Sequence, residues 1–91
     1  MAISKTRKDS MSKHQKALQR LLSKPTDFTW AELKSLMEGF SYELKLTGGS
    51  GRKFVKPEAV FAIHEPHPHK LLKAYQVRAV IEFLKKEGDI K

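Results

Sequence analysis

The chain lacks cysteine, and none of its apolar runs is long. Without cysteine there is neither a disulfide framework nor a thiolate nucleophile, so a zinc site would depend on histidine and carboxylate ligands. No run approaches the roughly 20 apolar residues that a membrane-spanning helix needs. The segment Met1–Met11 is polar and lacks the apolar core of a signal peptide. We therefore expect a soluble cytoplasmic protein with no membrane contact.

Acidic residues are scarce relative to basic ones. The 91 residues include 18 Lys and Arg against 10 Asp and Glu, a formal charge of +8. Residues 1–24 hold seven of the basic side chains and one acid. Such an excess suits an anionic partner, nucleic acid first and an acidic protein second, although a solubilising surface would explain the charge equally well. We predict a basic flexible arm over residues 1–11 and a single domain over residues 12–91.

The first helical pattern follows the basic arm. Ser12 can cap a helix that runs to about Lys24, where Pro25 ends it because proline disfavours a helical predecessor. Its predicted apolar face consists of Ala17, Leu18, Leu21 and Leu22. We expect His14, on the basic part of this helix, to lie at the surface.

Two further helices are predicted. Thr29 followed by Glu32 has the spacing of a capping box, and Gly39 is a plausible end for the helix that begins there. The buried stripe of this helix would be Trp30, Leu33, Leu36, Met37 and Phe40. A last helix begins at about Leu72 or Tyr75, ends at Glu87, and has Gly88 as its cap.

Three short strands lie between these helices. Ser41–Thr47 alternates in polarity, and Gly48–Gly51 is a hairpin connection to a second strand, Arg52–Lys56. Ala59–His64 is the third strand. The apolar face of the first strand would be Tyr42, Leu44 and Leu46. The order predicts an α+β sandwich with helices on one face of a three-stranded antiparallel sheet. Lys45 and part of the second strand would lie on the other face.

Cations surround the glycine-rich turn. Lys45, Arg52, Lys53 and Lys56 form a basic stretch without an intervening acid. Glycine amides can approach a phosphate closely, and arginine donates forked hydrogen bonds to it. The alternative is a hairpin that merely turns the chain. The residues that we expect to contact RNA or phosphate are Lys45, Ser50, Arg52, Lys53, Lys56 and Lys70.

Histidines gather after the third strand, at His64, His67 and His69. An imidazole can act as a general base near neutral pH, and RNA carries its own nucleophile in the 2′-hydroxyl. Base and cations can therefore support cleavage without a metal, with His64 and His67 as candidate catalytic residues. Solvated loop histidines are the alternative. A metal held by this cluster with Glu65 is less favoured, because residues two apart point to opposite sides of an extended segment. We expect no metal or cofactor, and no serine nucleophile at Ser50, which lacks a His–Asp pairing.

These motifs together resemble those of the HicA-type toxins of HicA–HicB toxin–antitoxin systems. The resemblance covers roughly residues 30–88 and rests on three segments. These are Gly48–Phe54, Ile63–Pro68, and the helix Val77–Leu84 that closes at Gly88. It implies a double-stranded-RNA-binding-like α-β-β-β-α sandwich, here with an extra N-terminal helix. It also implies an mRNA interferase, an endoribonuclease that inhibits translation and is neutralised by a HicB-type antitoxin.

The chain departs from this family in the turn. The family motif reads Gly, then Ser or Gly, then the catalytic His, with an aromatic three residues later. Gly49, Ser50 and Phe54 match, but Gly51 stands where the histidine is expected. Either cleavage has moved to His64 or His67, or the chain is a non-catalytic RNA-binding relative or an inactive toxin variant. A third hypothesis is a protein-interaction domain for an acidic partner.

Overall fold

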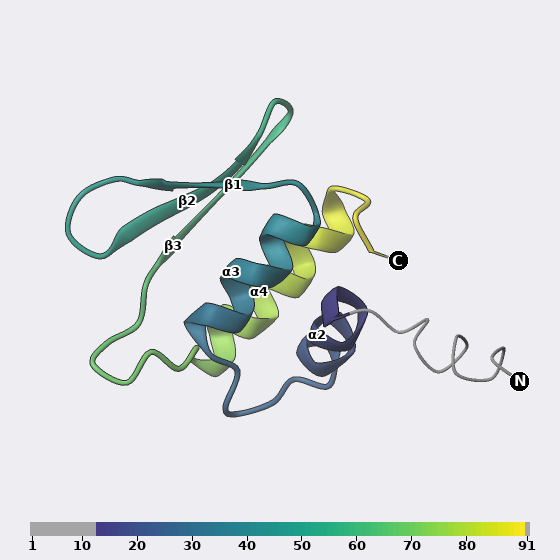
Figure 1. The fold of residues 1–91 in the computed structure, drawn as a ribbon, viewed down its shortest axis with the longest axis horizontal. Coiled ribbons are helices and arrows are strands. Elements are labelled where there is room, and N and C mark those ends of the chain that lie inside the picture. The colour runs from purple at the N-terminus through teal and green to yellow at the C-terminus, as the bar shows by residue number, and fades with distance from the viewer. Residues whose placement is uncertain (1–12, 91) are drawn as a thin grey trace, which may run out of the picture.

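The computed structural model describes residues 13–90 as three helices and a three-stranded sheet. The elements are α2 (Lys13–Leu22), α3 (Trp30–Gly39), β1 (Glu43–Leu46), β2 (Gly51–Lys56), β3 (Ala59–His64) and α4 (Ala74–Lys86). The strands pair antiparallel in the order β1-β2-β3. All three helices lie on one side of the sheet (Figure 1), which confirms the α+β class. The predicted arm and the Ser12 cap lie outside the described residues.

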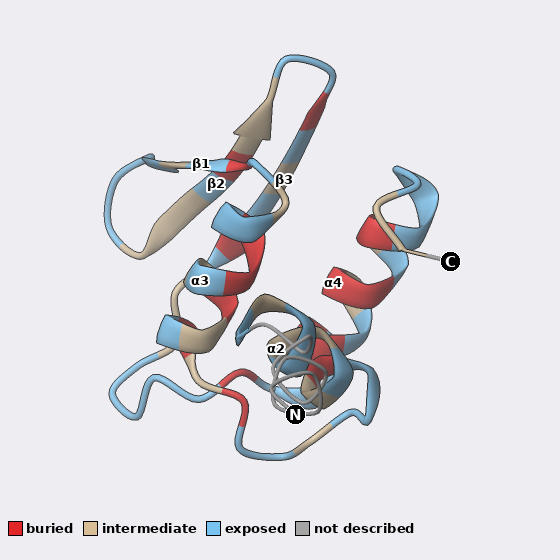
Figure 2. Ribbon diagram, turned by 45° about the vertical axis from the view of Figure 1, so that its right-hand side comes forward, coloured by how far each residue is buried: buried red, intermediate tan, exposed pale blue. Residues whose placement is uncertain are grey.

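One apolar core lies between the sheet and the helices. Buried residues line the sides of α3 and α4 that face each other (Figure 2). From the sheet, Phe54 meets the Trp30 ring with 5.7 Å between ring centroids. The buried apolar residues are Leu21, Phe28, Trp30, Leu33, Leu36, Met37, Tyr42, Phe54, Ala59, Ile63, Leu72, Val77, Val80, Ile81 and Leu84.

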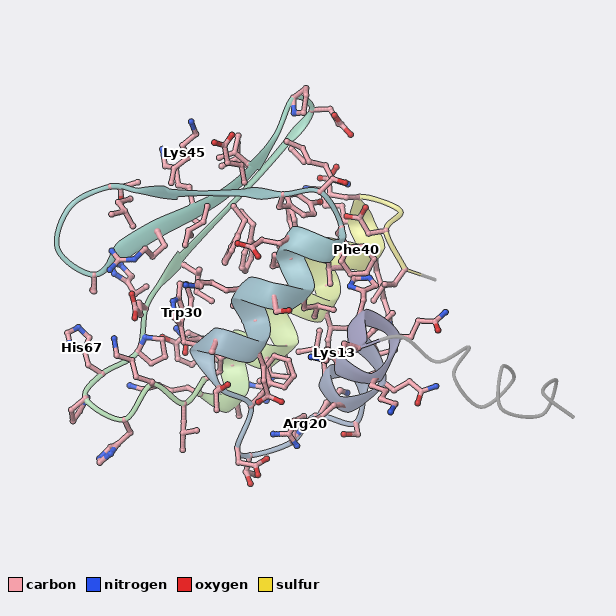
Figure 3. All side chains as sticks on the ribbon, viewed as in Figure 1. Lys13, Arg20, Trp30, Phe40, Lys45 and His67 are labelled. Atoms are coloured by element: carbon pink, nitrogen blue, oxygen red, sulfur yellow. The ribbon has the colours of Figure 1, made fainter. Side chains whose placement is uncertain are left out.

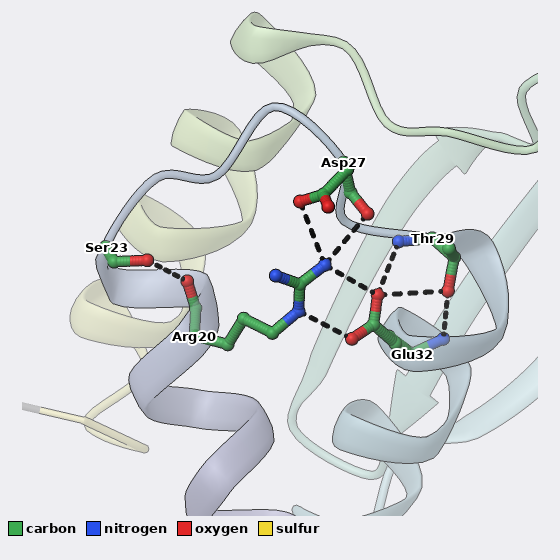
Figure 4. Close-up of polar contacts among 5 residues, drawn as sticks. All are labelled: Arg20, Ser23, Asp27, Thr29 and Glu32. Carbon is green, nitrogen blue, oxygen red and sulfur yellow. Dashed lines mark hydrogen bonds and ion pairs between the residues drawn. The ribbon is translucent and has the colours of Figure 1, made fainter.

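The start of α3 also anchors α2. The predicted capping box is confirmed: the Glu32 N–H donates to Thr29 Oγ1 at 3.0 Å, and the Thr29 N–H donates to Glu32 Oε1 at 2.8 Å. Arg20 of α2 donates from Nε to Glu32 Oε2 at 2.7 Å and from Nη2 to Asp27 Oδ1 at 3.0 Å (Figure 4). This guanidinium holds the pKa of the Glu32 carboxyl below its ordinary value.

The helix α3 ends at Gly39, as predicted, although Gly39 itself does not adopt a left-handed conformation. The left-handed residue is Ser41 (φ 75°), and the Tyr42 N–H closes the helix end on the Met37 carbonyl at 3.0 Å. Gly39 instead leaves room for His14, because an added Cβ would lie 2.1 Å from His14 Nδ1. The prediction that His14 is a surface residue is wrong: its ring is half-buried and packs edge-on against Phe40, with the centroids 4.4 Å apart.

The hairpin turn is confirmed, but two leucines that were predicted to lie on apolar faces are exposed. Gly48 and Gly49 adopt φ values of 105° and 52°, which only glycine adopts at little cost. Leu46, predicted to face the core, is 72% exposed, because its end of the sheet extends beyond the helices (Figure 1). Leu22, also predicted to be buried, is 42% exposed at the last residue of α2.

The end of α4 lies one residue before the predicted one. The helix ends at Lys86, and Gly88 follows the capping residue Glu87 with φ 83°. The Gly88 and Asp89 N–H groups donate to the Lys85 and Leu84 carbonyls at 3.1 and 2.9 Å. This double closure leaves Asp89 at a fixed position beside the sheet.

We predict that Gly39→Ala destabilises the protein although alanine favours helix. Alanine alone should gain roughly 0.5–1 kcal/mol, but its methyl group would displace the His14 ring, at an expected cost of about 1–3 kcal/mol. Urea unfolding measures the net change. In a His14→Ala background the same substitution should become stabilising. Stabilisation in both backgrounds would show that His14 does not occupy this space.

Candidate functional site

The register of the sheet decides which cations face outward. Lys45 pairs directly with Lys53, which pairs with Ala62, whereas Leu44 and Phe54 are partners on the core side. Direct partners lie on the same face and successive residues on opposite faces. Lys45 therefore points away from the helices, whereas Trp30 lies between helix and sheet (Figure 3). No helix among residues 13–90 covers this outer face.

Arg52 faces the other way and is already engaged. It forms an ion pair with Glu65, with Nη2 2.8 Å and Nε 3.0 Å from Oε1. Its Nη1 donates to the Gly49 and Gly51 carbonyls at 2.9 and 2.8 Å. The four cations of the basic stretch therefore do not share one surface, because alternation along β2 divides them between the two faces, so that only part of this strand faces outward, as predicted. Arg52 fixes the glycine turn rather than presenting its guanidinium to a ligand.

Lys56 is likewise engaged in contacts within the fold. Its Nζ lies 2.8 Å from Asp89 Oδ1 and 4.4 Å from the centroid of the Tyr42 ring. The Tyr42 hydroxyl donates to Asp89 Oδ2 at 2.6 Å. Burial, together with this hydrogen bond, raises the pKa of the Tyr42 hydroxyl. The three side chains join the sheet to the segment after α4, so Lys56 does not extend an outer groove.

Lys70 belongs to the same network as Arg52. Its Nζ lies 2.5 Å from Glu65 Oε2, so the two cations share one carboxylate. Lys70, and then Arg52, hold the pKa of Glu65 below its ordinary value. The Lys70 carbonyl also accepts from the Trp30 N–H at 2.9 Å. Lys70 thus secures the loop after β3 instead of standing beside Lys53.

His64 lies on the outer face, directly across the ladder from Gly51. Its Nδ1 lies 3.2 Å from Ser50 Oγ, and the neighbouring Glu65 N–H donates to the Ser50 carbonyl at 2.8 Å. Side chains on the turn and on the end of β3 are therefore held together. We call Lys45, Ser50, Lys53 and His64 the outer-face site.

Gln76 supports this site, and the sequence analysis missed it. The side chain is 5% exposed, its Nε2 donates to the His64 carbonyl at 3.1 Å, and its Oε1 accepts from the Lys73 N–H at 3.0 Å. It joins the first turn of α4 to the end of β3. A glutamine three residues after the N-cap of a helix is the only sequence signal of this role.

The other histidines lie apart from this arrangement. His67 and His69 are exposed in the loop between β3 and α4, and within residues 13–90 neither has a hydrogen-bond partner. Figure 3 shows His67 projecting from that loop. No three acidic or histidine side chains in the described part of the chain converge as metal ligands would. Of the predicted catalytic residues, only His64 shares a face with Lys45 and Lys53.

A shallow hollow of about 250 Å³ lies beside His64, lined in part by Thr47, Gly51, Lys53 and Ala62. An added Cβ at Gly51 would lie 2.4 Å from Thr47 Oγ1, so the Thr47 hydroxyl occupies the space that a side chain at position 51 would enter. The hollow is the size of a small group such as a phosphate with part of its sugar.

None of the helices within residues 13–90 is long and apolar enough to cross a membrane.

No protein-family model, curated protein or solved structure matches the chain.

We predict that Arg52→Met and Lys53→Met, which remove the same charge from adjacent residues, differ sharply in effect. Arg52→Met removes one of the two cations that bind Glu65 and the donor to two turn carbonyls, and should lower the free energy of unfolding by about 2 kcal/mol. Lys53→Met, on the outer face, should stay within about 0.5 kcal/mol of the wild type. Chemical denaturation at neutral pH measures both.

The loss in Arg52→Met should also depend on pH. The pKa of Glu65 is lowered in the folded state, so the stability from its ionised form is complete at neutral pH. That stability disappears as the pH falls below the ordinary value of 4.5 and through the folded-state pKa. The gap between wild type and Arg52→Met should shrink over that range. A gap that is constant with pH, or equal effects of the two substitutions, would contradict the assignment of Arg52 to the fold.

Proposed function

We propose that the chain is a HicA-like toxin, an RNA-binding endoribonuclease that inhibits translation by cutting mRNA. The observation that carries the proposal is the position of His64, on the same face as Gly51 and directly across the ladder from it. Gly51 is where the HicA-type motif would have its histidine. An imidazole from the neighbouring strand thus lies directly across from the position at which the family has its own histidine.

The charges around this imidazole favour a phosphodiester. Lys53 forms no ion pair within residues 13–90, and Lys45 has only a long contact of 3.7 Å with Glu43. Both are exposed and lie two residues along the ladder from the His64–Gly51 pair, at the next position on the same face. A phosphate in the hollow beside His64 would be near the Lys53 ammonium, which stabilises negative charge that develops on its oxygens.

The proposed chemistry needs only groups of this chain and of RNA. His64 takes the proton from a ribose 2′-hydroxyl, and the 2′-oxygen forms a bond to phosphorus while the bond to the 5′-oxygen breaks. The departing 5′-oxygen takes a proton from water, leaving a cyclic phosphate on one fragment and a hydroxyl on the other. Ser50, 3.2 Å from Nδ1, orients the ring so that Nε2 faces the substrate.

The arrangement of elements supports the same proposal. The order α3-β1-β2-β3-α4, with helices on one side of an antiparallel sheet, agrees with the double-stranded-RNA-binding-like sandwich that the resemblance implies, and α2 would then be the added N-terminal helix. A cytoplasmic location and a HicB-type antitoxin as protein partner follow from the proposal. The antitoxin gene would be expected beside that of the toxin.

The alternative is a non-catalytic RNA-binding relative or an inactive toxin variant. The glycine at position 51 favours it, because the turn itself then carries no proton acceptor. Such a protein would use Lys45 and Lys53 in the same way but would leave RNA intact. The two possibilities differ in cleavage and agree in binding.

We predict that the purified protein cuts labelled single-stranded or hairpin RNA in the presence of EDTA. His64→Ala should reduce the rate by about 10²-fold or more, because a general base contributes typically that much, while binding is retained. His67→Ala should cut at the wild-type rate. An RNA with 2′-deoxyribose at the cleavage position should bind but stay intact. Equal rates for wild type and His64→Ala would exclude His64 as the base.

A gain-of-function double variant distinguishes an active toxin from an inactive relative. Gly51→His should be combined with Thr47→Ala, since the Thr47 hydroxyl occupies the space of the new Cβ. If the wild type binds RNA without cutting and the double variant cuts, the chain is an inactive relative. If neither protein binds RNA, both forms of the proposal fail.

A further inference from the structure

We propose that a second site, on the helix side of the molecule, binds an acidic and partly apolar segment of a partner protein. Two hollows of about 420 and 240 Å³ lie between α4 and the segment that follows α2. They share Lys24 and Arg78 in their walls, so they form one groove. Because the helices cover only one side of the sheet, this helix groove lies apart from the outer-face site (Figure 1).

One face of α4 forms the long wall of the helix groove. Ala74, Val77, Arg78, Ile81 and Lys85 line it, and they recur at the three- and four-residue spacing of one helical face. At 1.5 Å per residue, this wall is about 17 Å long from Ala74 to Lys85. That length matches about three turns of a bound helix.

The rim of the helix groove is cationic. Lys24, Lys73, Arg78 and Lys85 line it and are exposed, with Glu82 as the only acid among the lining residues. Within residues 13–90 none of the four cations forms an ion pair. Their positive charge is not used by the fold, in contrast to that of Arg20, Arg52 and Lys56. An occupant with carboxylates would complement it.

The floor of the helix groove is apolar and contains no aromatic side chain. Leu22, Pro25, Leu72, Val77 and Ile81 contribute to it, and Leu22 is 42% exposed. Proteins that bind single-stranded nucleic acid combine a basic groove with aromatic rings on which bases stack, and no such ring lines this groove. Apolar side chains of a peptide would instead cover Leu22 while acidic ones meet the rim. An amphipathic acidic helix has this pattern.

This inference does not depend on whether the outer-face site cuts RNA. It also gives Leu22 a role: an exposed leucine that the core does not use. The added helix α2 and the segment after it form one wall, so the helix groove exists only because the chain carries that helix.

The test is a fluorescence anisotropy titration with a labelled peptide of about 12 residues, the length of the wall. Leucines at i, i+4 and i+7 form one face of the peptide, and glutamates flank them. Two matched peptides replace the glutamates with glutamine or the leucines with serine. The acidic amphipathic peptide should bind the full chain, and each replacement should weaken binding by about tenfold or more, since each removes one of the two complementarities.

Variants of the protein locate the binding. Lys85→Glu and Arg78→Glu should each weaken binding of the peptide by about tenfold or more, because the new carboxylate repels the glutamates of the peptide. Lys86→Glu makes the same charge change one residue along α4, outside the lining, and should have little effect. Thermal unfolding confirms that the variants fold. No binding, equal weakening by Lys85→Glu and Lys86→Glu, or displacement of the peptide by a labelled RNA from this groove would overturn the proposal.

Discussion

The two-residue alternation of β2 is the constraint on which the rest of the structure depends. It turns Arg52 and Lys56 toward the helices and leaves Lys53 on the opposite face. A cation that faces the helices needs a carboxylate, because a charge removed from water without a partner costs several kcal/mol. Glu65 and Asp89 provide these carboxylates, and each lies just beyond a secondary-structure element. The pairing therefore fixes the loop after β3 and the segment after α4.

The same arrangement holds the outer-face site in place. Arg52 binds two carbonyls of the glycine turn and the carboxylate next to His64. The turn and the end of β3 are thereby held together, which brings Ser50 Oγ within 3.2 Å of the imidazole. Gln76 adds a second support from α4. Arg52, which was predicted to bind phosphate, thus acts on the site indirectly, by holding the backbone of the turn and of the end of β3.

Local chemistry allowed much of this fold to be predicted from the sequence. The capping box at Thr29, the Gly48–Gly49 turn and the glycine after α4 are short-range signals, and all three are confirmed. Predictions that depended on distant contacts were the ones that failed. His14, predicted at the surface, packs against Phe40 beside Gly39 of another helix, and Arg52 is engaged by Glu65. A pattern of charges in sequence does not show which of them the fold will neutralise.

In the proposed function, Lys45, Lys53 and His64 form the RNA-binding surface, and the inward cations and the helix groove do not. An amide-detected NMR titration of the isotope-labelled protein with a 2′-O-methyl RNA, which binds but has no 2′-hydroxyl to attack, tests this placement. We expect the largest shift changes to cluster at Lys45, Ser50, Lys53 and His64, with α2 and α4 little changed. The largest changes along α4 between Ala74 and Lys85, or no localised changes at all, would contradict it.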